Sequence, residues 1–285
     1  MSTRSLGLKY TAQGLGDRIH LVSLCYEISK AKSETVTLHL AKNHLDGRKH
    51  DSFLEILNLF PNNFVKLRFH ESAFQTTSEW RNYLIREGIY ALSFEYRDHA
   101  GWLEKPSDVD ASLFLHTRHL IQPSCEHKPK LPTEFVTVQW DSTGKDRQLP
   151  DYEVSNIERR YRESGLVVIR LGGQSTDHLL KDCLNCSAVA IYKSKYFAGV
   201  DSGFLHLALQ IKNPSLIHFY TARNRYWSHH TFRAIEIGCV VNYHSKKLNS
   251  IDFIFAKFRY DSPRLMKLVH KLKQLVRIER HETHD

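Results

Sequence analysis

The sequence predicts an α/β protein built from two doubly wound parallel sheets. Short apolar runs alternate with segments of helical period along most of the chain. Several of these runs are rich in β-branched residues and lack strict polar alternation, which is typical of parallel strands covered on both faces. A proline-rich stretch, IQPSCEHKPKLPTE at 121–134, interrupts the alternation once. These observations predict two α/β domains, 1–125 and 133–285, that face each other across a cleft.

The expected strands are the apolar runs between turn-forming residues. In the first half they lie at 6–11, 35–40, 64–69, 89–94 and 112–116, and in the second half at 135–139, 166–170, 196–200, 215–220 and 239–243.

Helices are expected in the spacers between these strands. The segment 15–29 puts Leu15, Ile19 and Val22 on one face. The segment 262–279 begins with serine and proline, which favour a helix N-terminus, and combines an apolar stripe with lysines and arginines. We expect this basic helix either to pack back on the protein or also to contact anionic lipid.

The composition is that of a basic globular protein. Its 285 residues include 40 lysines and arginines against 31 acidic residues, a formal net charge of +9. Such a surplus favours nucleic acid, an anionic membrane surface or phosphorylated small molecules as partners, although a basic protein without such a partner has the same composition. The basic residues are spread out and form no DNA- or RNA-binding motif, so no nucleic-acid partner is expected.

The cysteines and the N-terminus indicate a cytoplasmic protein. The five cysteines are scattered and odd in number, which favours reduced thiols. Cys183 and Cys186 form one C-x-x-C, and no second pair follows at zinc-site spacing, so the sequence predicts no metal or redox site. No signal peptide and no apolar stretch long enough to span a membrane is recognisable.

The segment YTAQGLGDRIHLVSL at 10–24 leads from a strand into a helix. Gly14 and Gly16 would let the backbone turn tightly and approach a ligand. A dinucleotide-binding fingerprint needs a third glycine where Ile19 stands, and no Gly-Lys-Ser/Thr of a phosphate loop follows. What remains is Asp17 in the first helical turn, at the sheet edge where ligands bind. An aspartate that only interacts with the helix macrodipole explains the pattern equally well.

The segment GVDSGFLHLAL at 199–209 contains a string known from serine proteases, but it joins a strand to a helix. The esterase elbow fails as well, because Val200 stands where a glycine is required. Ser202 is therefore expected to be a helix N-cap rather than a nucleophile. The helix start, Asp201 to Phe204, would present the amides of Ser202, Gly203 and Phe204 to a pyrophosphate. His206 could donate to a phosphate or be a buried helix histidine.

A hydroxyl-rich and basic loop, QWDSTGKDRQLPD at 139–151, follows the first strand of the second half. It contains donors that suit phosphate oxygens: Ser142, Thr143, Lys145 and Arg147. A solvated charged loop would have the same composition.

These three segments together resemble the family 9 glycosyltransferases, which include the lipopolysaccharide heptosyltransferases. The resemblance rests on GLGDRIHL at 14–21 and on the more specific DSGFLHLA at 201–208. It implies the GT-B architecture of two Rossmann-like domains that face a cleft, with an N-terminal acceptor domain, a C-terminal donor domain and a C-terminal helix that packs back.

The resemblance also implies a role for each site residue. Asp17 would be the general base on the acceptor hydroxyl, near the backbone turn at Gly14 and Gly16. The donor diphosphate would be held by two groups of residues, namely Ser142, Thr143 and Arg147, with Lys145 beside them, and Asp201, Ser202, Gly203, Phe204 and His206.

The expected activity is an inverting, metal-independent transfer from a nucleotide-diphosphate sugar to a cell-surface glycan or glycolipid. Lipopolysaccharide or surface polysaccharide synthesis, at the cytoplasmic face of the inner membrane, is the expected context. No cofactor or metal is expected, and the string Asp108-Val109-Asp110 is discounted because no apolar strand precedes it. The alternatives are a sugar-nucleotide epimerase or hydrolase of the same fold and a non-enzymatic, basic nucleic-acid-binding protein.

Overall fold

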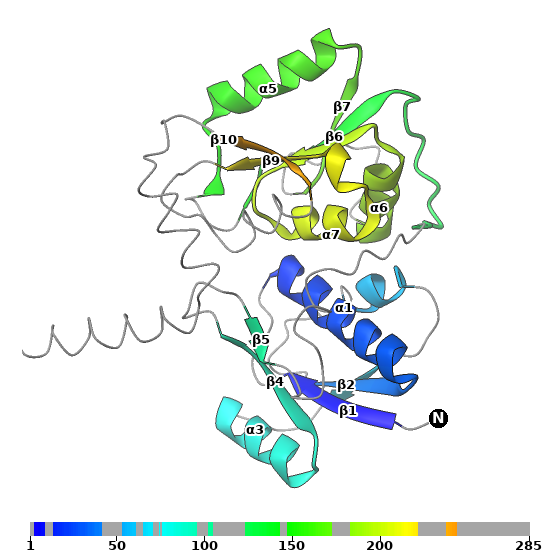
Figure 1. Ribbon diagram of the computed structural model, residues 1–285, viewed down its shortest axis with the longest axis vertical. Helices are drawn as coiled ribbons and strands as arrows, with labels where there is room; N and C mark the ends of the chain where they lie inside the picture. Colours follow the sequence, from blue (N-terminus) through cyan, green and yellow to red (C-terminus); the bar gives the residue numbers. More distant parts are fainter. Residues whose placement is uncertain are drawn as a thin grey trace, which may run out of the picture.

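The computed structural model contains two five-stranded sheets, one in each half of the chain (Figure 1). It describes residues 3–8, 14–41, 53–60, 65–70, 74, 76–95, 102–104, 123–142, 147–172, 183–221 and 238–243.

The N-terminal sheet has the strand order β3-β2-β1-β4-β5. Its strands are β1 (Thr3–Leu8), β2 (Thr35–Ala41), β3 (Val65–His70), β4 (Tyr90–Glu95) and β5 (Trp102–Glu104). The first four strands are parallel, and Leu6 in the centre pairs with Leu38 on one side and Tyr90 on the other. The edge strand β5 is antiparallel to β4, so this sheet is mixed rather than purely parallel.

The C-terminal sheet has the order β10-β9-β8-β6-β7 and is parallel throughout. Its strands are β6 (Phe135–Gln139), β7 (Val167–Arg170), β8 (Tyr196–Gly199), β9 (Ile217–Thr221) and β10 (Val240–Tyr243). Every residue of β6 is buried, as expected for an interior strand covered on both faces.

Most of these strands begin within two residues of the start that the apolar runs predict. β1 is an exception, since it begins three residues earlier than expected. β9 begins late because Asn213 accepts a hydrogen bond from the Ser215 amide and caps a short 3₁₀ helix, η6 (Pro214–Leu216). The three-residue β5 was not predicted, and the strand expected at 112–116 lies outside the described residues.

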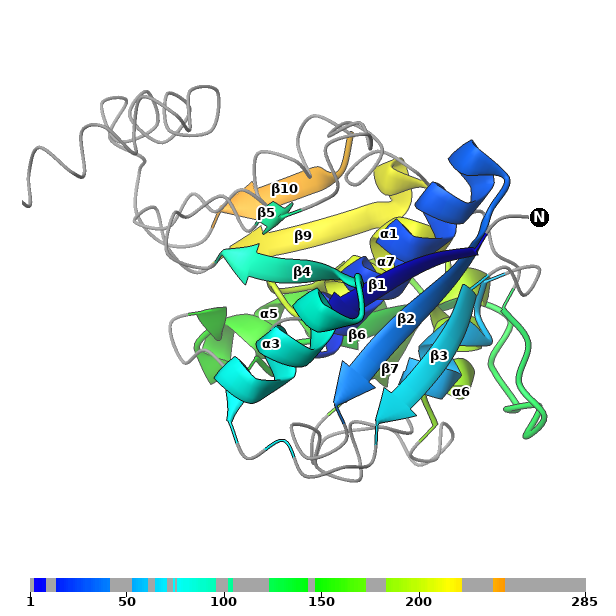
Figure 2. The ribbon, with the colours of Figure 1, turned by 90° about the horizontal axis from the view of Figure 1, so that it is seen from below.

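The helices form layers on both faces of the sheets (Figures 1 and 2). α3 (Thr77–Arg86) covers the outer face of the N-terminal sheet, and α5 (Asp151–Glu163) covers the outer face of the C-terminal sheet. Between the sheets lie α1 (Leu15–Lys32), α6 (Leu184–Lys193) and α7 (Gly203–Ile211).

α1 and α7 pack directly against each other, so the two halves share one apolar core. Ile19 and Val22 of α1 and Leu205 and Ala208 of α7 are all essentially inaccessible to solvent and belong to one cluster. The Ser23 hydroxyl of α1 also donates to the Gln210 side-chain oxygen of α7, at 3.5 Å. The two layers that the sequence puts on either side of a cleft are therefore in contact at these helices.

A buried carboxylate fixes α5 to the C-terminal sheet. Glu158 is 1% exposed and accepts hydrogen bonds from Arg170 of β7 at 2.7 and 2.9 Å, from the Trp140 indole at 3.0 Å and from Arg162 at 2.8 Å. Burial alone would raise the pKa of Glu158, but these hydrogen bonds outweigh it and hold the pKa below its ordinary value.

Two further predictions concern the ends of the domains. The basic helix expected at 262–279 lies outside the described residues. The domain limits 1–125 and 133–285 remain predictions.

Among the described helices, none combines the length and the apolar character that crossing a membrane requires.

Candidate active site

Each sheet changes its winding direction next to the strand that comes first in its half of the chain, β1 or β6. In the C-terminal sheet, β7 lies on one side of β6 and β8 on the other, and in the N-terminal sheet β2 and β4 flank β1 in the same way. Open α/β sheets bind ligands at the carboxyl ends of the strands at such a switch point. The connections that leave β6, β8 and β1 are therefore where a ligand site is expected, and they contain the three sequence segments singled out above.

The connections after β6 and β8 are tied together at Asp201. The Ser142 hydroxyl donates to the Asp201 carbonyl at 3.2 Å. The guanidinium of Arg147 forms an ion pair with the Asp201 carboxylate, with Nη1 3.7 Å from Oδ2. Arg147 is nearly half exposed, whereas the Asp201 side chain is 16% exposed. The loop thus presents a cation to solvent beside the start of α7.

The start of α7 has the capped geometry that the sequence predicts. Ser202 is the N-cap, and its hydroxyl accepts a hydrogen bond from the Leu205 amide at 3.4 Å. The amides of Gly203 and Phe204 lie in the first turn, where no helical carbonyl precedes them by four residues. They therefore have no hydrogen-bond acceptor within the helix. The imidazole of His206 is mostly buried, and its Nε2 lies 3.7 Å from Oδ1 of Asp201.

The N-terminus of α1 meets the N-terminus of α7 through two glycines. A Cβ on Gly16 would lie 2.5 Å from Cδ2 of His206, and a Cβ on Gly203 would lie 2.6 Å from the Leu15 Cβ. Only glycine permits this approach without a displacement of the neighbouring atoms. Two helix N-termini, each carrying a positive partial charge, are thus in contact, and an anion beside them would be stabilised by both macrodipoles.

The remaining predicted site residues fall into two groups. Gly14 immediately precedes α1, and its carbonyl accepts a hydrogen bond from the Arg18 amide at 3.3 Å. Asp17 lies in the first turn of α1, next to Gly16. Its side chain is not among the parts of the chain that the structure describes. Thr143 and Lys145 lie outside the described residues.

One contact of α7 was not predicted from the sequence. Gly172, at the end of β7, has a φ of +76°, and a Cβ there would lie 2.9 Å from the ring of Phe204. The double glycine at 172–173 was the only sequence signal for this contact with Phe204. A second interaction that the sequence did not predict is the hydrogen bond from the Gln139 side-chain amide to the Asp141 carbonyl, at the start of the connection after β6.

A cysteine cluster was also missed. The sequence predicts no metal site because no second C-x-x-C follows Cys183 and Cys186. The structure brings Cys125, 58 residues away from Cys183, to a sulfur–sulfur distance of 3.7 Å from it. A single cysteine in the segment between the sheets has no spacing signature, so only the fold reveals this neighbour.

Comparison with known proteins relates the chain to glycosyltransferases by structure. No family model and no curated protein matches the sequence. The iron-containing dodecameric glycosyltransferase TibC of enterotoxigenic E. coli is similar in structure, with a TM-score of 0.51 and 11% sequence identity over 77% of this chain. The match spans 58% of the TibC chain.

A second solved structure matches over nearly the full length of both proteins. The family 9 glycosyltransferase of Veillonella parvula has a TM-score of 0.50 and 13% sequence identity, over 96% of this chain and 98% of that one. At such identities the similarity concerns the fold, in agreement with the two sheets and their flanking helices. The chain has the two-domain α/β GT-B fold of these glycosyltransferases.

Proposed function

We propose that this protein is a glycosyltransferase that takes its sugar from a nucleotide-diphosphate sugar. The observation that carries this proposal is the convergence of α1 and α7 at the switch points of their sheets, with Arg147 beside the start of α7. Two helix N-termini and a cation together suit a ligand with two negative phosphates.

The diphosphate would lie against the first turn of α7. The amides of Gly203 and Phe204 would donate to its oxygens, and Arg147 would supply the positive charge that stabilises the leaving group as the glycosidic bond breaks. Asp201 would help to bind the diphosphate indirectly, because its carboxylate and the phosphates repel each other. Its carboxylate would instead align Arg147 and His206, both of which lie 3.7 Å from it.

Asp17 is proposed as the general base. Its place in the first turn of α1 puts it one residue from Gly16, whose backbone is in contact with His206. Attack by the acceptor hydroxyl from the face opposite the leaving group would invert the configuration at the anomeric carbon. With the developing charge stabilised by amides and Arg147, the transfer is proposed to need no divalent cation at the diphosphate.

The acceptor is proposed to be a cell-surface glycan or glycolipid. A protein that modifies such an acceptor during lipopolysaccharide or surface polysaccharide synthesis would work in the cytoplasm, at the inner face of the membrane. The net charge of +9 supports contact with an anionic surface.

A thermal-shift screen of ADP-, GDP-, UDP- and CMP-linked sugars tests the donor class. A ligand present at about 100 times its dissociation constant adds about 2.7 kcal/mol to the free energy of unfolding. We expect at least one diphosphate-linked sugar to raise the melting temperature. If no nucleotide or nucleotide sugar raises it, while an arbitrary oligonucleotide binds in a salt-dependent manner, the protein is a nucleic-acid binder instead.

The variant Asp17→Asn tests the role of the base. The amide is close in size to the carboxylate but cannot accept the proton, so we expect transfer to be lost while the donor still binds with nearly wild-type affinity. Equal loss of transfer and binding would remove Asp17 from this role. Conversion or hydrolysis of the donor at full rate without any acceptor would identify an epimerase or hydrolase.

A further inference from the structure

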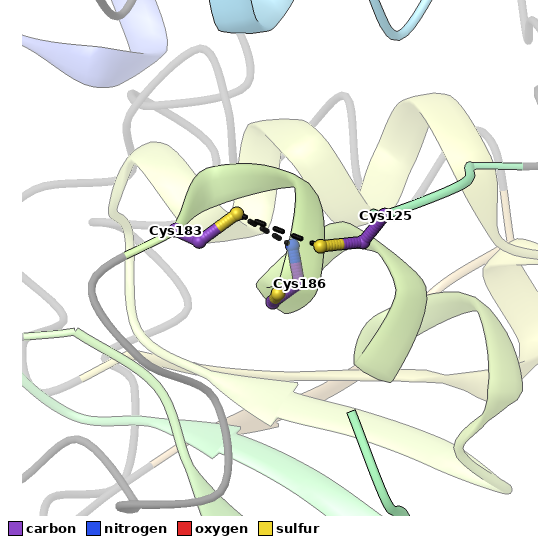
Figure 3. A group of neighbouring side chains, drawn as sticks. All are labelled: Cys125, Cys183 and Cys186. Carbon is purple, nitrogen blue, oxygen red and sulfur yellow. Dashed lines mark hydrogen bonds between the residues drawn. The ribbon is translucent and has the colours of Figure 1, made fainter. Parts of the chain in front are cut away.

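Three cysteines gather at the start of α6 (Figure 3), a helix that contains none of the proposed active-site residues. Cys183 is the residue before the first turn of this helix, Cys186 lies in that turn, and Cys125 comes from the segment that connects the two sheets. The three sulfur atoms lie within 4.8 Å of one another, and those of Cys125 and Cys183 are 3.7 Å apart. All three thiols are free.

The distances between the sulfurs fit a tetrahedral metal site. Zinc binds thiolate sulfur at about 2.3 Å, so two sulfurs on a tetrahedral ion are about 3.8 Å apart. The Cys125–Cys183 separation agrees with this value. A disulfide would require about 2.05 Å between sulfurs, much less than the observed separation.

The local backbone also supports metal binding. Cys183 is the N-cap of α6, and its sulfur accepts a hydrogen bond from the Cys186 amide at 3.4 Å. The Cys186 amide and the positive end of the helix therefore face a sulfur that would carry negative charge once a metal is bound. The two-residue spacing of Cys183 and Cys186 is the usual spacing of a zinc-binding cysteine pair.

The burial of the three residues leaves a path for an ion. Cys186 is 1% exposed, so a metal there would be shielded from bulk solvent on that side. Cys125 and Cys183 are only partly buried, so an ion can enter between them and keep a fourth position open to water. Three thiolates are soft ligands that select ions such as Zn²⁺ or Fe²⁺ over Mg²⁺ or Ca²⁺.

We propose that Cys125, Cys183 and Cys186 bind one divalent transition-metal ion as thiolates, with solvent at the fourth position. Binding releases the three thiol protons to water. The ion would attach the connection between the sheets to α6, which packs against α7. Its role would therefore be to hold together the two halves of the protein, and it takes no part in the proposed sugar transfer.

Metal analysis of the full-length protein tests this proposal. The protein is purified without chelators, incubated with zinc sulfate, freed of unbound ions and analysed for zinc and iron by mass spectrometry. We expect about one ion per chain in the wild type, either zinc or iron, and below about a tenth of this in Cys125→Ser and Cys183→Ser. The matched control Cys239→Ser, a partly buried cysteine outside the cluster, should retain the wild-type metal content. A wild type without stoichiometric metal, or variants that retain it, would overturn the proposal.

A second measurement needs no variant and so does not depend on how the variants fold. Wild-type protein is alkylated with and without zinc, and the labelled cysteines are identified by peptide mass spectrometry. Zinc should protect Cys125, Cys183 and Cys186 together and leave the labelling of Cys239 unchanged. A zinc-independent pattern would contradict the site. So would a Cys125–Cys183 disulfide in protein that takes up no zinc after reduction.

Discussion

Gly16 of α1 and His206 of α7 are in contact at the junction of the two sheets, where a Cβ on Gly16 would lie 2.5 Å from the imidazole Cδ2. His206 is in turn 3.7 Å from Asp201, whose carboxylate also pairs with Arg147. The position of one glycine in the first half of the chain therefore constrains the groups that we propose to bind the donor.

The first prediction follows from this contact. Gly16→Ala should destabilise the protein by about 1–3 kcal/mol, the usual cost of overpacking, because the imidazole or α1 must move. In a His206→Ala background the clash disappears, and the alanine should be neutral or stabilising by roughly 0.5–1 kcal/mol through its higher helix propensity. Urea unfolding of the four proteins in this double-mutant cycle measures the coupling. The same cost in both backgrounds would show that the contact does not exist.

Arg147 is predicted to contribute to donor affinity and not to the fold. A hydrogen bond to a charged group contributes about 1.5–3 kcal/mol, so Arg147→Ala should weaken the binding of the identified nucleotide sugar about tenfold or more. Arg159→Ala, a highly exposed arginine on α5, is the control and should bind as the wild type does. Isothermal titration calorimetry provides both affinities. Equal affinity of the two variants would exclude Arg147 from the site.

Glu158 is predicted to be the critical carboxylate of α5. Glu158→Ala should cost about 1.5–3 kcal/mol, since it removes the hydrogen bonds of Arg170 to a buried carboxylate and leaves the Trp140 indole without its acceptor. Glu163 on the same helix is exposed and pairs with Arg159 only at 3.8 Å, so Glu163→Ala should change stability by less than about 1 kcal/mol. Chemical denaturation compares the two. Similar costs would contradict the buried network.

His39 and His70 predict a loss of stability in mild acid. Their rings are stacked at the ends of β2 and β3, with Nδ1 of His39 2.9 Å from Nε2 of His70. Burial lowers the pKa of His39 from 6.5 to about 4, and the positive charges of His70 and Arg68 act in the same direction. The pKa of His70 is lowered as well, by burial first and then by Arg68, against an opposing effect of Glu87.

The sign of the effect follows from these directions. The unfolded chain takes up protons at about pH 6.5, before the folded protein does, so stability is present above this pH and is lost as the pH falls toward 4. Each unit of difference in pKa corresponds to about 1.4 kcal/mol. The variant His39→Gln has no titratable group at position 39. Its free energy of unfolding should therefore fall less than that of the wild type between pH 6.5 and pH 4. Parallel stability curves for the two proteins would refute this assignment.

The sequence predicted the strands well because parallel strands leave a local signal. β6 and β8 are short apolar runs that end at turn residues, and their positions depend on burial on both faces. β5 was missed because an edge strand of three residues is determined by its pairing with β4 and not by its own residues.

Part of the geometry at the candidate site was predictable from the sequence, and for a physical reason. Ser202 could be recognised as a helix cap because capping is local. The pairing of Arg147 with Asp201 required the loop after β6 to lie beside the start of α7, which follows from the sheet order. The contacts of Gly16 with His206, and of Cys125 with Cys183, join residues far apart in the sequence that no local pattern relates.

The central claim is that the start of α7 binds a diphosphate. The most direct test compares the affinities of nucleotides that differ by one phosphate. The dissociation constants of the nucleoside diphosphate and monophosphate with the preferred base are measured on the wild-type protein by calorimetry. The second phosphate should gain a hydrogen bond to Arg147 or to the helix amides, so the diphosphate is predicted to bind about tenfold more tightly or better. Equal affinity for the two nucleotides would contradict the account.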